Sequence, residues 1–212
     1  MKKLLLSAFV ICLAGTSIAQ ESPLWMRHCA LSPDGTTIAF TYKGDIYTVP
    51  STGGRATQIT TNPAFDTEPV WSPDSKQIAF ASDRMGSLDV FVVSSEGGAP
   101  QRLTTHSGSE KPVAYKDNKH ILFTANIAPS AEDAGFPSGQ FQQVYEVAVT
   151  GGRPAMFSSM PMECISINKE GVMLYQDKKG YEDYWRKHQV SPIARDIWTY
   201  TPGKKPVYQK QT

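Results

Sequence analysis

The sequence has few of the residues, and none of the short patterns, that many enzymes use for catalysis. It contains three cysteines and four histidines in 212 residues, and the histidines are scattered without the spacing of metal ligands. It has no Gly-x-Ser-x-Gly, no His-Glu-x-x-His and no phosphate-binding loop pattern. These absences exclude a hydrolase nucleophile elbow, a zinc-protease helix and a P-loop from this segment. We expect no catalytic residue, no metal and no cofactor in it.

The sequence also lacks an excess of charge of either sign. Its 21 basic residues are balanced by 20 acidic ones, and lysine and arginine form no long cluster. A protein that binds nucleic acid or an anionic membrane surface through its electrostatic field needs such an excess or a basic patch. We therefore expect neither nucleic acid nor a membrane surface among its partners.

The longest apolar run, Leu4–Ala14, follows two lysines and precedes the small-x-small sequence Ser17-Ile18-Ala19. This is the pattern of a secretory signal peptide, which we place at residues 1–19. The run is shorter than the roughly twenty residues that a membrane span needs. Cys12 lies inside the run and lacks the pattern that precedes a lipidated cysteine. We expect the remaining chain, 20–212, to be periplasmic or secreted and to have no membrane span.

Two cysteines, Cys29 and Cys164, remain after the signal peptide. An oxidising compartment permits a disulfide between them. Both, however, fall at the start of the first expected strand of their own repeat, where small buried thiols are common. We therefore favour two small buried thiols over a disulfide, although the sequence alone leaves the pairing open.

What the sequence does have is a tandem repeat of about forty to fifty residues. The segment 31–40, Leu-Ser-Pro-Asp-Gly-Thr-Thr-Ile-Ala-Phe, returns at 71–80 as Trp-Ser-Pro-Asp-Ser-Lys-Gln-Ile-Ala-Phe. A second element, Asp45–Val49 with a double glycine after it, recurs in the second and third copies and, degraded, as Asp196–Tyr200 in a fourth. A period of this length is typical of one blade of a β-propeller.

Each copy divides into four strands joined by tight turns. In the first copy we expect strands at 28–31, 36–42, 45–49 and 56–60. Several strands are apolar at consecutive positions, which indicates that both of their faces are covered, as in a blade between two neighbours and unlike in a sandwich. The sequence thus predicts an all-β protein, a β-propeller with about four blades of four antiparallel strands. The expected blades are approximately 24–61, 66–106, 110–158 and 162–212. Because four blades are few for a closed propeller, we expect them to be part of a larger ring.

Two copies carry an insertion between their second and third strands, at 127–140 and 177–194. Insertions in repeat proteins collect where binding occurs, so we expect this face to be the working face. The second insertion is rich in aromatic and cationic residues, a composition enriched at contact surfaces. The alternative is that these aromatics pack onto the fourth blade. The candidate contacts for a partner or substrate are Tyr184, Trp185, Arg186, His188, Arg195 and Trp198.

The middle turn of the second copy contains Asp83 and Arg84. Aspartate in such a turn commonly accepts hydrogen bonds from loop amides. We expect this role for Asp83 and a pairing with a nearby acid for Arg84. Both roles are structural, and neither residue is predicted to be catalytic.

The motifs of the second copy resemble one particular repeat. Ser-Pro-Asp at 72–74, Ile-Ala-Phe at 78–80, Asp-Arg-x-Gly at 83–86, Asp-Val-Phe at 89–91 and Gly-Gly-x-x-x-x-Leu-Thr at 97–104 are similar to the TolB-type β-propeller repeat. That repeat occurs in a periplasmic propeller protein, in prolyl-oligopeptidase relatives and in tricorn-type proteases. The signal peptide and the runs 184–189 and 195–198 most resemble secreted bacterial tricorn proteases of the tail-specific serine peptidase family.

The resemblance implies the non-catalytic propeller of an exported tricorn-like serine peptidase, in which the propeller is a substrate filter and a docking scaffold. Its partners would be polypeptide substrates and, on the same protein, a second propeller, a PDZ domain and a protease domain. A stand-alone TolB-like periplasmic protein-binding module is the alternative, and the propeller of a prolyl-oligopeptidase relative is a third reading.

Overall fold

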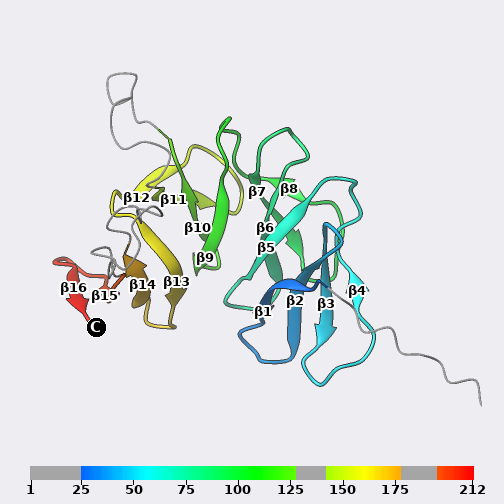
Figure 1. Cartoon of the computed structure of the whole chain (residues 1–212), viewed down its shortest axis with the longest axis horizontal. Helices are drawn as coiled ribbons and strands as arrows, with labels where there is room; N and C mark the ends of the chain where they lie inside the picture. Colours follow the sequence, from blue (N-terminus) through cyan, green and yellow to red (C-terminus); the bar gives the residue numbers. More distant parts are fainter. Residues whose placement is uncertain (1–24, 128–141, 178–194) are drawn as a thin grey trace, which may run out of the picture.

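The computed structural model describes residues 25–127, 142–177 and 195–212, which form four antiparallel sheets of four strands each. In every sheet the strands neighbour one another in chain order, so each sheet is one repeat. The sheets follow one another along an arc, with the first strands near its centre and the fourth strands at its periphery (Figure 1). The predicted all-β propeller arrangement of four four-stranded blades is confirmed.

The fourth strand is the shortest strand of every blade, with two to four residues. Blade 1 contains β1 (Arg27–Leu31), β2 (Thr37–Tyr42), β3 (Asp45–Pro50) and β4 (Thr57–Gln58). Blade 2 contains β5 (Asp66–Trp71), β6 (Gln77–Ser82), β7 (Asp89–Ser94) and β8 (Gln101–Arg102). Blade 3 contains β9 (Lys111–Asp117), β10 (His120–Ala125), β11 (Gln143–Ala148) and β12 (Ala155–Ser158). Blade 4 contains β13 (Met162–Ile167), β14 (Met173–Asp177), β15 (Ile197–Thr201) and β16 (Val207–Lys210).

The Ser-Pro-Asp turns between first and second strands are held by their own side chains. In blade 1 the Ser32 hydroxyl donates to Asp34 Oδ1 over 2.6 Å, and the amide of Thr36 donates to the same oxygen over 3.0 Å. In blade 2 the Ser72 hydroxyl donates to Asp74 Oδ1 over 2.7 Å. These bonds favour the ionised carboxylate and lower the pKa of both aspartates, and the bond from the serine hydroxyl is the main cause. The recurring sequence therefore encodes a turn that is stable locally.

The first strand of three blades carries a β-bulge at a residue with a left-handed backbone. These residues are His28, Glu68 and Cys164, with φ values of 50°, 54° and 53°, and the pairing with the second strand shifts register there. A bulge interrupts the regular alternation of side chains between the two faces, and these strands lie at the centre of the arc. Cys29 and Cys164 are consequently exposed and free. The prediction of buried thiols is wrong, and the two thiols do not form a disulfide in the structure.

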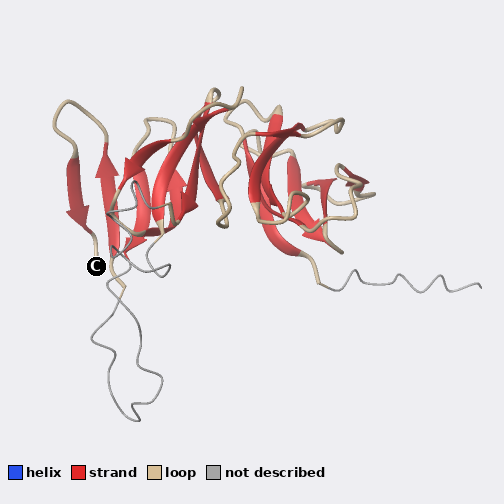
Figure 2. Ribbon diagram, turned by 90° about the horizontal axis from the view of Figure 1, so that it is seen from above, coloured by secondary structure: helices blue, strands red, loops and turns tan. Residues whose placement is uncertain are grey.

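The hydrophobic core is divided among the contacts between successive blades. We call the side of a blade toward the next blade in the chain its onward face. On the onward face of blade 1, Ala39 and Ile46 belong to one cluster with Phe80 and Phe91 of blade 2, whose ring centroids are 5.9 Å apart. The equivalent stacked rings of blade 3, Phe123 and Tyr145, pack in the same way against blade 2. Each fully buried large side chain contributes about 1.5–3 kcal/mol. Blade-to-blade packing therefore holds the arc together, and Figure 2 shows the sheets following one another with loops at both ends.

The two ends of the strands carry different loops, which define two faces of the arc. The turn face carries the Ser-Pro-Asp and double-glycine turns. The hairpin face carries the middle hairpins, between second and third strands, and the crossings to the next blade. In blade 1 the middle hairpin is Lys43-Gly44, with φ values of 51° and 90°, as a tight two-residue turn requires.

The longer middle hairpins belong to blades 3 and 4. They connect β10 to β11 and β14 to β15, so both insertions occur at the expected place in the blade. Residues 128–141 and 178–194, which make up most of them, lie outside the described residues. In the part of the chain that the structure describes, no helix is long and apolar enough to cross a membrane.

Candidate functional site

The described residues offer contact surfaces rather than a reaction centre. Within them, no group of three or more His, Cys, Asp or Glu side chains is arranged so that it could hold a metal ion. Their buried acids lie at the junctions between blades. The candidate site therefore has two parts, a hollow at the centre of the arc and the onward face of blade 4.

A hollow of about 580 Å³ lies where the first strands of all four blades end, on the turn face. The last residues of these strands, Leu31, Trp71, Asp117 and Ile167, all contribute to its wall. Apolar side chains alternate there with charged ones of both signs, such as Asp117 and Lys116. The wall therefore carries charges of both signs next to apolar surface.

The onward face of blade 4 is exposed, unlike the onward faces of the other three blades. Leu174 is 46% exposed and Ile197 is 40% exposed. The strand register makes each equivalent to one residue in every earlier blade. These equivalents are all 0% exposed: Ala39, Ala79 and Leu122 for Leu174, and Ile46, Val90 and Val144 for Ile197. The face has the composition of a blade interface, and no described residue covers it to the same extent.

Blade 4 is complete in its own hydrogen bonding. Strand β16 pairs with β15 along its whole length. The Ile197 amide donates to Thr212 Oγ1 over 2.9 Å, and the same bond joins the equivalent residues of blades 1 and 2. The exposure of the onward face is thus not caused by an unfinished sheet.

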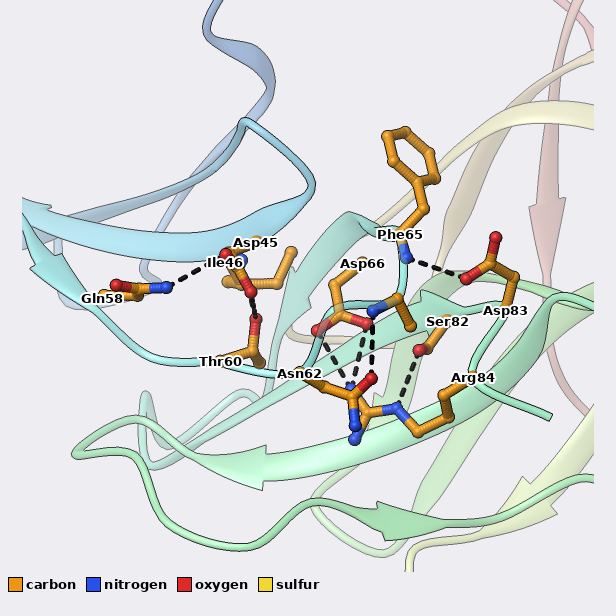
Figure 3. A network of polar contacts seen from close by, with 11 residues as sticks. Asp45, Ile46, Gln58, Thr60, Asn62, Phe65, Asp66, Ser82, Asp83 and Arg84 are labelled. Carbon is orange, nitrogen blue, oxygen red and sulfur yellow. Dashed lines mark hydrogen bonds and ion pairs between the residues drawn. The ribbon is translucent and has the colours of Figure 1, made fainter.

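The junction between blades 1 and 2 holds a closed polar network (Figure 3). The Arg84 guanidinium donates to both oxygens of Asp66 at 3.0 Å, and its Nε donates to the Ser82 hydroxyl at 2.8 Å. Asp66 is 0% exposed, so its charge depends on this partner. Asp83 Oδ1 accepts a hydrogen bond from the amide of Phe65 over 2.8 Å. The structural roles predicted for Asp83 and Arg84 are confirmed.

The equivalent junction between blades 2 and 3 is less completely paired. Asp89 and Glu110 are both 0% exposed, and Arg102, from β8, contacts Asp89 over 2.8 Å. Neither carboxylate oxygen of Glu110 has a hydrogen-bond partner of good geometry among the described residues. Burial, together with the neighbouring charge of Asp89, raises the pKa of Glu110 to about 7. Two residues after the second strand, where blade 2 has Arg84, blade 3 has Ile127.

Two of the six predicted contact residues are described. Arg195 pairs with Glu163 over 2.7 Å, and the Trp198 indole N–H donates to Asp177 Oδ2 over 3.1 Å, both within blade 4. Trp198 packs against the cluster shared by blades 3 and 4. A contact role for these residues stays a prediction. The other four, Tyr184, Trp185, Arg186 and His188, lie outside the described residues.

The buried acids and the open face of blade 4 were not found from the sequence. A signal for the acids exists, because Asp66 and Glu110 stand at the same point of their repeats, just before or at the start of the first strand. No such signal marks Leu174, since its neighbours in the sequence look like those of Leu122. Its exposure is a property of the arc and not of the local sequence.

Comparison with known proteins identifies a family that matches nearly all of the described residues. The family described as "Tricorn protease N-terminal beta propeller domain" matches residues 23–210. Tricorn protease homolog 1 of Streptomyces coelicolor is 39% identical over 77 residues, which are 36% of this chain and 7% of that protein. The chain thus spans a small part of this relative.

Solved structures share the fold at low sequence identity. The crystal structure of the tricorn protease superimposes with a TM-score of 0.65 at 16% identity, over 90% of this chain and 19% of that one. The crystal structure of TolB from Acinetobacter baumannii gives a TM-score of 0.63 at 18% identity, over 89% of this chain and 43% of that one. Identities this low support the propeller fold alone.

Proposed function

The chain belongs to the family of tricorn protease N-terminal β-propeller domains, and from this premise we propose that it is the non-catalytic propeller segment of an exported tricorn-like serine peptidase. In this role the propeller filters polypeptide substrates and provides a docking surface for the other parts of the peptidase. Export to the periplasm or the medium follows from the expected signal peptide at residues 1–19.

The observation that carries the proposal is the exposed onward face of blade 4. Leu174 and Ile197 leave apolar surface in water that every earlier blade buries against its successor. Burying such surface is favourable by about 25 cal/mol per Å², and three internal examples show that the next blade is what buries it. We infer that a further blade of the same polypeptide packs here and continues the ring.

The hollow at the centre of the arc supports the filter role. It is lined by all four first strands, so its width is set by how the blades pack side by side. The positions of these strands are set by the close-packed contacts between successive blades, and such packing does not deform easily. An extended peptide fits such an opening, whereas a folded protein does not, and selection by size protects folded proteins from a reactive serine.

The experiment that tests the proposal measures the intact mass of the endogenous protein and the casein-degrading activity of two preparations. The mass should be several times that of the 212-residue chain, and the endogenous protein should degrade casein while the purified 212-residue chain should not. Turnover by the purified 212-residue chain would overturn the non-catalytic role. An endogenous mass near that of the chain itself would favour the stand-alone TolB-like binding module instead.

A pair of variants in the endogenous protein tests the docking surface. Leu174→Asp places a charge on the onward face of blade 4 and should expose the chain after blade 4 to limited proteolysis. Met156→Asp, on β12, is the matched control, because Met156 is 43% exposed but lies on an outer strand. Equal proteolytic patterns for the two variants would show that nothing docks on this face.

A further inference from the structure

A second hollow, of about 370 Å³, lies on the hairpin face, at the opposite end of β1 from the central hollow. Its wall is formed by the start of the described chain, the middle hairpin of blade 1 and the crossing from blade 1 to blade 2. The side chains that matter for its chemistry are Trp25, Arg27, Thr41, Lys43 and Phe65. Only the backbone amide of Phe65 takes part in the polar network described above, and none of the five side chains belongs to that network or to the face of blade 4.

Two aromatic side chains form exposed walls of this hollow. Trp25 is 74% exposed and Phe65 is 47% exposed. The backbone of Phe65 is fixed from behind, because its amide donates to Asp83 Oδ1 over 2.8 Å. The ring of Phe65 also lies 3.7 Å from the position that a Cβ on Gly44 would take, so the hairpin and the crossing are in close contact. Aromatic surface that is held rigidly and left in water is typical of binding sites.

The charges around the hollow have one sign. Arg27 and Lys43 contribute to its wall, and no acidic side chain does. Among the described residues neither cation has an ion-pair partner. The Arg27 guanidinium lies instead over the Trp25 ring, 5.3 Å from its centroid. The chain as a whole is nearly neutral, so this local pair of cations is not part of a general basic surface.

A buried hydroxyl also lines the hollow without a partner. Thr41 is 3% exposed, and its Oγ1 makes no hydrogen bond with any described residue. Buried hydroxyl groups are nearly always hydrogen-bonded in folded proteins. An acceptor placed in the hollow would therefore complete a site that already has two cations.

We propose that this hollow binds an acidic side chain of a polypeptide segment that carries an apolar residue next to the acid. The carboxylate accepts hydrogen bonds from Arg27, Lys43 and the Thr41 hydroxyl, and the neighbouring apolar side chain packs on Trp25 and Phe65. Both aromatic side chains are largely exposed, so a bound chain can continue past them in both directions. An internal acidic segment therefore fits better than a terminal carboxylate. The inference goes beyond the proposed function, because it requires neither a closed ring nor a peptidase domain.

The test is the binding of fluorescein-labelled peptides to the 212-residue chain, measured by anisotropy. The probe is the blocked peptide acetyl-Gly-Ser-Glu-Phe-Ser-Gly-amide with a labelled linker, and its partner has Gln in place of Glu. We expect the Glu peptide to bind about tenfold more tightly, and its affinity to fall with added salt. Arg27→Gln and Lys43→Gln should each abolish most of this preference, and Phe65→Ala should weaken both peptides.

Arg55→Gln is the matched control, since it removes one exposed cation from blade 1 outside the hollow. Circular dichroism checks that each variant is folded. Equal affinities for the Glu and Gln peptides would overturn the proposal, as would an effect of Arg55→Gln equal to that of Lys43→Gln. A Gln peptide with a free carboxyl terminus that binds as tightly as the blocked Glu peptide would overturn the assignment to an internal acid.

Discussion

Asp66, between blades 1 and 2, and Glu110, between blades 2 and 3, occupy the same position in their repeats and differ in how they are paired. Asp66 receives two hydrogen bonds from Arg84, which comes from the hairpin region of its own blade. In blade 3 the position equivalent to Arg84 is Ile127, so no arginine pairs with Glu110 from there. The pKa of Glu110 is raised to about 7. The acid of the first strand is thus paired with an arginine at one junction, whereas at the other an isoleucine stands at the position of that arginine.

The acid on the third strand has a partner at both junctions, but the partner differs. Asp45 accepts a hydrogen bond from Gln58 over 3.0 Å, and Asp89 pairs with Arg102 over 2.8 Å. The partner comes from the fourth strand in each case. The junctions therefore differ in the partner of each acid, and substitutions at the acid of the first strand and at its arginine position test the effect of that difference.

Arg84→Leu should have the largest effect, because it leaves Asp66 buried without its cation. Removing one partner of a buried pair costs about 3–5 kcal/mol, and the guanidinium also lies 4.5 Å from the centroid of the Phe91 ring. Urea denaturation of the 212-residue chain measures the loss at neutral pH. Arg55→Leu, at an exposed site, should change the free energy of unfolding by less than about 0.5 kcal/mol, and equal losses for the two variants would contradict the network.

Leu122→Ala and Leu174→Ala extend the comparison from the paired junctions to the open face. Both residues occupy the same register position, but Leu122 is 0% exposed and Leu174 is 46% exposed. Truncating a buried leucine costs about 2–5 kcal/mol, whereas Leu174→Ala should cost less than about 1 kcal/mol in the 212-residue chain. The free energies of unfolding of the two variants provide the measurement. Similar costs would show that the face of blade 4 is covered.

The repeat, the four blades and the strand order could be predicted from the sequence because they depend on local patterns. Ser-Pro-Asp turns and consecutive apolar positions are properties of a few neighbouring residues. The exposure of Cys29 could not be predicted in this way, since it depends on a β-bulge and on the position of β1 at the centre of the arc. The hollow beside Thr41 likewise becomes visible only when the start of the described chain, the hairpin of blade 1 and the crossing to blade 2 are placed together.

Glu110→Gln should stabilise the protein in a pH-dependent manner. The pKa of Glu110 is raised from an ordinary value of 4.5 to about 7, so the folded state binds the proton more tightly than the unfolded state. The resulting stability is fully present below about pH 4.5 and is lost as the pH rises through about 7. Glutamine is neutral at every pH. The variant should therefore match the wild type at pH 4.5 and exceed it by on the order of 2 kcal/mol at pH 8.

The measurement is the free energy of unfolding at several pH values between 4.5 and 8. Glu96→Gln, at an exposed site in the double-glycine turn of blade 2, is the control and should leave the wild-type pH dependence unchanged. If Glu110→Gln left the slope between pH 5 and 7 as steep as in the wild type, the titrating group would not be Glu110.

Ile127→Arg transfers the arginine of blade 2 to the equivalent place in blade 3. The new guanidinium should lie near Glu110 and Asp89 and lower the pKa of Glu110, because an opposite charge favours the ionised form. The gain at pH 8 should be only about 1 kcal/mol, since desolvating the arginine opposes the attraction and Ile127 packs against the core cluster. Ile127→Gln loses the same packing without adding a charge. The measurement is the pH at which the free energy of unfolding begins to fall, and its difference between the two variants isolates the effect of the charge. Equal pH profiles would show that position 127 does not determine the pKa of Glu110.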